Sequence, residues 1–132
     1  MEMNQIDKSN FFRGLLLLVS KDNKITNSEK ESILSIGKSL GYSDDYCRSS
    51  VNEILINKYI SNKPPKFTDK NTAKKFIDTG IQIAISDYNL HIEEINWIFE
   101  TAKSNQIDRV WVEDRLIKMF KENGQNKEII KP

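Results

Sequence analysis

Cysteine and histidine are almost absent from this chain of 132 residues. It contains one cysteine, Cys47, and one histidine, His91. A single cysteine cannot form a disulfide within the chain, which is typical of proteins kept in a reducing compartment. One cysteine and one histidine also cannot supply the four side-chain ligands of a structural zinc site. The sequence therefore excludes a disulfide framework and a zinc finger, and we expect a cytoplasmic location.

An excess of charge and long apolar runs are lacking as well. The 20 basic and 19 acidic residues give a net charge of +1, whereas proteins that bind nucleic acid through its phosphates usually carry a basic excess on one face. The apolar run LLLLV at 15–19 is much too short to span a bilayer. We therefore expect no nucleic-acid partner and no membrane span.

Proline and glycine are also sparse, with three and five residues respectively. Apolar residues instead recur three to four positions apart along most of the chain, which is the period of an α-helix. The one clear interruption is the segment SNKPPKFT at 61–68, whose adjacent prolines prevent a helix from continuing. The length suffices for one hydrophobic core. The sequence predicts a single all-α domain over 1–132, a bundle of six or more helices.

Local signals mark the ends of the first three helices. Gly41 suits the left-handed position that follows a helix, and Ser43 can cap the helix after it. In this third helix we expect four apolar side chains to be buried: Tyr46, Val51, Ile54 and Leu55.

The chain aligns with itself without a gap when it is shifted by 65 residues. The shift pairs Phe11 with Phe76, Leu18 with Ile83, Asp22 with Asp87, Ile25 with Leu90, Glu29 with Glu94, Ile33 with Ile98 and Val51 with Leu116. Amphipathic helices can resemble one another by chance, but a constant shift with a matching Asp and Glu favours duplication.

The self-alignment predicts two three-helix units within the bundle. The predicted parts are repeat 1 at about 9–60, the linker at 61–68, repeat 2 at about 69–122 and a frayed tail at 123–132. The segments at about 11–20 and 73–86 have the most continuous apolar surface. A helix that is apolar nearly all round is usually buried, so we expect these two helices to form the central pair.

Both copies carry the spacing D-x-x-[IL]-x-x-x-E, with Asp22 and Glu29 in the first and Asp87 and Glu94 in the second. A calcium EF-hand loop ends on a bidentate glutamate at position twelve and begins on an oxygen ligand. Counting back from each glutamate places an aliphatic residue at the first position, which is Leu18 in the first copy. The sequence therefore excludes an intact EF-hand.

Two interpretations of these acids remain open. In TNSE at 26–29, the Thr26 hydroxyl can cap a helix while Glu29 bonds back to the Thr26 amide. His91 and Glu94 take the same places in the second copy, and an aspartate after a helix can bond the amides of its own turn. The alternative is weak binding of a divalent cation by Asp22, Glu29, Asp87 and Glu94. We favour capping, because a short motif without its full ligand set is weak.

Two segments resemble the tellurite-resistance TerB-like family. They are LLLLVSKDNKITNSEKESILSIGKSLG and GIQIAISDYNLHIEEINWIFETAKSNQI, and the resemblance extends over about 9–122. Asn23 and Tyr88 stand where the family motif has a glycine after each aspartate. The resemblance implies an α-helical bundle that acts in a bacterial stress or tellurite-resistance system. It also implies contact between the acidic residues and a divalent metal.

No arrangement of nucleophile, base and acid is visible in the sequence. His91 stands alone and is best explained as a residue at the start of a helix. We therefore expect a non-enzymatic module that binds other proteins, with no certain cofactor. The alternative is a small metal-assisted hydrolase assembled from scattered acidic residues.

Overall fold

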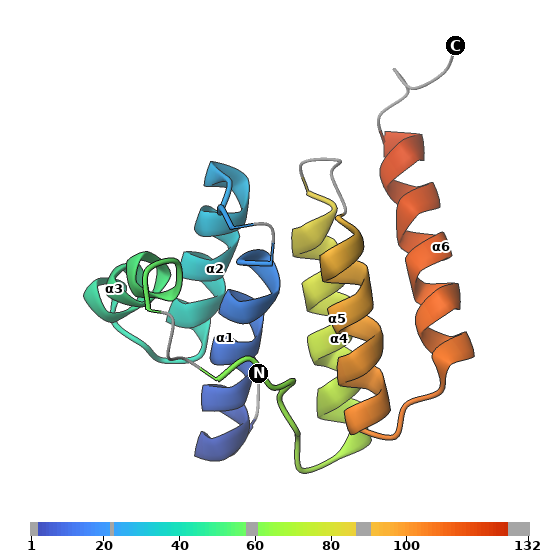
Figure 1. Cartoon of the computed structure of the whole chain (residues 1–132), viewed down its shortest axis with the longest axis horizontal. Helices are drawn as coiled ribbons and strands as arrows, with labels where there is room; N and C mark the ends of the chain where they lie inside the picture. Colours follow the sequence, from blue (N-terminus) through green and yellow to red (C-terminus); the bar gives the residue numbers. More distant parts are fainter. Residues whose placement is uncertain (1–2, 22, 58–60, 87–90, 127–132) are drawn as a thin grey trace.

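The computed structural model describes residues 3–21, 23–57, 61–86 and 91–126, and it confirms an all-α fold (Figure 1). These residues form six helices and no strand. The helices are α1 (Gln5–Val19), α2 (Asn27–Ser39), α3 (Asp44–Ile54), α4 (Lys70–Ala84), α5 (Ile92–Ser104) and α6 (Arg109–Asn126). None of the helices in the described ranges combines the length and apolar character that crossing a membrane requires.

The helix boundaries follow the 65-residue shift of the sequence. Each helix of the second half begins 65 residues after its counterpart, at Lys70 for Gln5, Ile92 for Asn27 and Arg109 for Asp44. The first two pairs of helices also have equal lengths, of 15 and 13 residues. These matching boundaries agree with two related units, while their origin by duplication stays a prediction.

The helix contacts repeat in the same way. The central helices α1 and α4 pack on each other, α2 and α3 lie on the side of α1, and α5 and α6 lie on the side of α4 (Figure 1). Among the described residues, each contact between two helices has a counterpart in which α1, α2 and α3 are exchanged with α4, α5 and α6. For example, α1 contacts α5 and α4 contacts α2, while the contact of α1 with α4 is its own counterpart. This pattern of contacts is the one expected if an approximate two-fold axis passes between α1 and α4 and relates the two halves.

The core lies where α1 meets α4, as the apolar patterns of these helices predicted. Phe11, Leu15 and Leu18 of α1 are fully buried, and so is Ile81 of α4. A Cβ added at Gly80 would lie 2.9 Å from a methyl carbon of Leu18. This distance is shorter than van der Waals contact, so the central helices approach closely at Gly80.

The ends of α2 and α5 have the same hydrogen bonds. The Tyr42 amide donates to the Gly37 carbonyl at 3.0 Å, and the equivalent bond from Ile107 to Ala102 measures 2.9 Å. These bonds define Schellman motifs, which need a left-handed residue directly after the helix cap. Gly41 has this conformation at φ +101°, as predicted, and its counterpart Gln106 adopts it at φ +58°.

The expected burial of α3 was partly wrong. The predicted Ser43 cap is present, because the Ser43 hydroxyl accepts the Tyr46 amide at 3.1 Å. Tyr46 and Leu55, however, are 53% and 45% exposed. The helix packs inward through Cys47 and Val51 instead, and these residues are four positions apart on one face. The Tyr46 side chain therefore lies at the border of the packed face, half exposed and with its ring centre 5.1 Å from that of Tyr42.

The last helix is longer than predicted. It continues through Asn126, whereas repeat 2 was predicted to end at about 122 and a frayed tail was expected from 123 onward. Residues 121–126 contain no proline to stop the helix, and Gly124 lowers helix propensity without preventing a helix. Residues 127–132 lie outside the described ranges.

The linker at 61–68 is held by side chains of both halves. The Asp7 carboxylate of α1 accepts the amide and the hydroxyl of Thr68, at 3.1 and 2.6 Å. The Asn105 side chain, just after α5, donates to the Pro65 carbonyl and accepts the Phe67 amide, both at 2.9 Å. The connection between the halves is therefore an ordered part of the fold.

Candidate functional site

Two of the four predicted metal candidates can be placed in the structure. Asp22 and Asp87 lie outside the described residues. Glu29 and Glu94 occupy equivalent positions in the first turns of α2 and α5, and they are 3% and 0% exposed. Burial of both carboxylates is a property that the sequence spacing did not reveal.

The predicted capping role of Glu29 is confirmed. The Thr26 hydroxyl accepts the Glu29 amide at 3.1 Å, and Glu29 Oε1 accepts the Thr26 amide at 3.0 Å. In the second half, Glu94 Oε1 accepts the His91 amide at 3.2 Å. His91 is the residue that precedes α5, as predicted. Both glutamates therefore satisfy an amide that would otherwise lack a partner at a helix start.

A metal role for the four acids stays a prediction. Within the described ranges, no three or more histidine, cysteine, aspartate or glutamate side chains gather closely enough to hold an ion. One oxygen each of Glu29 and Glu94 already accepts a backbone amide. An ion at either position would need further ligands from the adjoining turn, and two carboxylates are few for calcium, which takes six to eight oxygen ligands.

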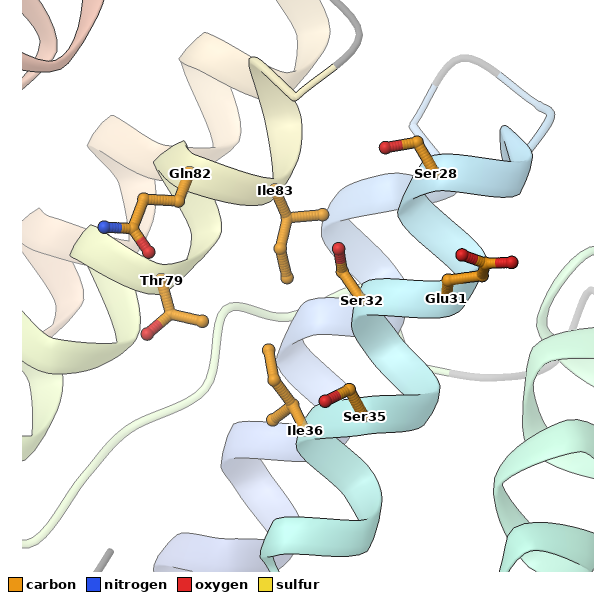
Figure 2. Close-up of a pocket in the computed structure, with 8 residues that line it drawn as sticks. All are labelled: Ser28, Glu31, Ser32, Ser35, Ile36, Thr79, Gln82 and Ile83. Atoms are coloured by element: carbon orange, nitrogen blue, oxygen red, sulfur yellow. The ribbon is translucent and has the colours of Figure 1, made fainter. Parts of the chain in front are cut away.

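A groove between α2 and α4 is one of the concave surfaces in the described part of the chain. Its volume is about 540 Å³, and Figure 2 shows its lining. The lining residues are Ser28, Glu31, Ser32, Ser35 and Ile36 of α2 and Thr79, Gln82 and Ile83 of α4. Small hydroxyl side chains and one amide therefore surround two isoleucines.

The two helices contribute different parts of the groove. Ile36 and Ile83 face each other across the gap, while Ser32 and Ser35 project into it from α2 (Figure 2). Glu31 stands on the outer side of α2, at the rim. The groove thus has an apolar centre, hydroxyl edges and one acidic side chain at its border.

A hydrogen bond between the halves lies beside the groove at Ser28. The Ser28 hydroxyl donates to the Ser86 hydroxyl at 3.0 Å, and Ser86 in turn donates to the Ile83 carbonyl at 2.8 Å. These bonds connect the first turn of α2 with the residue that follows the cap of α4.

This groove was not predicted from the sequence, because its residues form no motif. Serine and threonine on an outward helix face are ordinary surface residues. The self-alignment held a signal nevertheless, because Ser32 pairs with the large Trp97 and Thr79 pairs with Gly14. Such differences in side-chain size at equivalent positions indicate that the helix interface is packed differently in the two halves.

Comparisons with known proteins add no relative. The chain matches no family model, and neither the curated proteins nor the solved structures gave a significant match. The resemblance to the TerB-like family therefore depends on the two quoted segments alone.

Proposed function

We propose that this protein is a non-enzymatic module that binds other proteins, and that the groove between α2 and α4 is its docking site. The observation that carries the proposal is the lining of the groove. Serine and threonine hydroxyls and the Gln82 amide can both donate and accept hydrogen bonds, which suits the alternating N–H and C=O groups of a polypeptide. Ile36 and Ile83 add apolar surface for a side chain of the partner.

The chemistry of the groove supports binding over catalysis. Its ionisable lining residue is Glu31, which is exposed at the rim. A general base or a nucleophile normally needs a second group to orient or activate it, and Glu31 would have to act alone. This arrangement favours an interaction module over the alternative of a metal-assisted hydrolase.

For the biological setting we propose a bacterial stress or tellurite-resistance system, which is what the resemblance of the two segments to the TerB-like family implies. We propose a cytoplasmic location because the chain has a single cysteine, Cys47. Weak contact of Asp22, Glu29, Asp87 and Glu94 with a divalent cation is a secondary part of this proposal, because the two resembling segments contain the four acids.

Site-specific cross-linking in cells tests the docking site. A photoreactive benzoylphenylalanine at Ser35 projects into the groove, while the same residue at the exposed Ser49 of α3 is the control. We expect Ser35 alone to capture a discrete protein, which mass spectrometry identifies and a binding assay with purified components reproduces. The same captures from both positions, or none from Ser35, would contradict the proposal.

A further inference from the structure

The groove between α2 and α4 has an equivalent on the opposite side of the molecule, between α1 and α5. The 65-residue shift relates Thr79 to Gly14 and Ser32 to Trp97, and both pairs of helices are in contact. A Cβ added at Gly14 would lie 2.8 Å from a ring carbon of Pro65. The linker therefore lies directly on the α1 wall of this second groove.

The linker also contacts the α5 wall. The Trp97 indole N–H donates to the Asn62 carbonyl at 3.4 Å. Lys21, at the end of α1, donates to the Asn62 side chain and places its ammonium 5.2 Å from the centre of the Trp97 ring. Residues 62–65 thus cross the groove from one helix to the other.

The fold holds the linker through its main chain and also through two apolar side chains, because Pro65 is fully buried and the Phe67 ring centre lies 5.2 Å from that of Phe76. Asn10 donates to the Lys66 carbonyl at 3.2 Å, and Asn105 engages the Pro65 carbonyl and the Phe67 amide. Asp7 accepts the Thr68 amide. Short polar side chains on the helices therefore hold an extended segment whose prolines keep it from becoming helical.

The open groove presents polar groups of its own that can bond a main chain, at other positions than in the occupied groove. Ser32 stands in place of Trp97 and Gln82 in place of Leu17, whereas Thr79 stands in place of the smaller Gly14. No described residue of the chain fills it, since a volume of about 540 Å³ remains between its walls. The α1–α5 groove is thus occupied by the linker of the same chain, and the equivalent α2–α4 groove is open.

We infer that the α2–α4 groove binds an extended, lysine-bearing segment of a partner protein, in the way that the α1–α5 groove holds residues 62–68. This inference rests on the proposed docking function and names the chemistry of the partner. The linker provides the internal precedent for an extended segment. The rim carboxylate of Glu31 complements a lysine and repels a phosphate or an acidic peptide.

Titration with a peptide tests the inference on the full chain. The probe is the octapeptide SNKPPKFT, which reproduces residues 61–68, added to ¹⁵N-labelled protein and followed by NMR. We expect the amide signals of Ser32, Ser35, Thr79 and Gln82 to shift with saturation. A peptide in which glutamate replaces both lysines should bind at least about fivefold more weakly, because it loses attraction to Glu31.

Two variants with matched controls examine the groove directly. Ser35→Trp should weaken binding at least about tenfold by blocking the gap, as loss of shape complementarity at an interface does. Glu31→Lys should weaken it about fivefold or more by reversing the rim charge. The controls Ser49→Trp and Glu53→Lys, both exposed on α3, should bind as the wild type does.

Each outcome decides between the two proposals. Saturable shifts in the groove that both variants reduce support the inference. Shifts confined to the surroundings of Trp97, equal binding by Glu31→Lys, or no shift at millimolar peptide would overturn it. If Ser35 still captures a partner in cells while the peptide fails, the docking function stands and the assigned ligand chemistry is wrong.

Discussion

Phe11 packs edge-on against Phe76, with ring centres 5.4 Å apart and ring planes at 88°. The two residues are 65 positions apart and are therefore equivalent in the two halves. Contact between such residues is expected where an approximate two-fold axis passes, and the helix contacts agree with an axis between α1 and α4. The contact between the Phe11 and Phe76 rings consequently links the two halves at the centre of the core.

Phe76→Ala should strongly destabilise the protein. Phe76 is 2% exposed, and removing a buried phenylalanine leaves a cavity that typically costs about 3–5 kcal/mol. Denaturant titration measures this loss. Phe120→Ala is the control, because Phe120 is 45% exposed and its truncation should cost about 1 kcal/mol or less. Similar losses for both variants would contradict the central position of Phe76.

Gly37→Ala should destabilise the contact between α2 and α3. A Cβ at Gly37 would overlap Cys47 Sγ and lie 2.8 Å from a ring carbon of Phe12. Overpacking of this kind costs about 1–3 kcal/mol. The double variant Gly37→Ala with Cys47→Ala removes the closest clash, so a double-mutant cycle should show recovery of at least about 0.5 kcal/mol. Strictly additive losses would mean that Cys47 is not the obstacle.

Glu29→Ala should cost less than truncation of the core. If capping is its main role, the loss is about 0.5–2 kcal/mol, whereas Leu18→Ala should cost about 2–5 kcal/mol. Chemical denaturation of both variants gives the ranking. An equal or larger loss at Glu29 would show that its buried carboxylate has a role beyond the cap.

The stability of the protein should respond to alkaline pH through Cys47. Burial raises the pKa of the Cys47 thiol, with a smaller contribution from Asp44. The folded state therefore keeps this proton at pH values where an unfolded cysteine, with its ordinary pKa of about 8.5, has lost it. The stabilisation that the protonated Cys47 thiol gives the folded state is fully present below the ordinary cysteine pKa. It is lost as the pH rises through the higher pKa of Cys47 in the folded state.

A Cys47→Ala variant isolates this effect. The difference in unfolding free energy between wild type and variant should shrink as the pH rises above about 8.5. It is measured by urea denaturation across a pH series. Titration of Lys21 is common to both proteins and cancels in the comparison. The pKa of Tyr42 is raised mainly by burial, with smaller contributions from Tyr46 and Cys47, so the same pH series on a Tyr42→Phe background separates its part. A difference that stays constant with pH would show that the thiol is accessible to solvent.

Divalent cations should bind weakly to the isolated protein. Two carboxylates in each half are few ligands for calcium or magnesium, so we expect dissociation constants on the order of 0.1–1 mM or weaker. Isothermal calorimetry with calcium, magnesium and zinc measures them. Tight, stoichiometric uptake that Asp22→Asn together with Asp87→Asn abolishes would move metal binding to the centre of the function.

The helices and their ends were predictable from the sequence because their causes are local. The capping box at Thr26 and the left-handed Gly41 depend on residues within a single turn. The burial of Tyr46 was predicted wrongly, since which face of α3 turns inward depends on how α3 meets α1 and α2. Helical periodicity alone does not determine that orientation.

The candidate groove was not predicted from the sequence, because it arises from packing. Its walls come from α2 and α4, and residues such as Ser32 and Thr79 are 47 positions apart (79 minus 32). Nothing in either segment indicates that these helices are neighbours. The capping glutamates were found because four residues contain the whole motif, whereas the groove exists only after the halves have docked.

The hydrogen bonds of the linker bear on how the chain folds. Asp7 reaches Thr68 across 61 positions, and Asn105 reaches Phe67 across 38. Such contacts close long loops, and their entropic cost is recovered only when both halves are already in place. Neither half should therefore reach its native stability by itself, and unfolding should be a single cooperative transition in which the two halves separate and melt together.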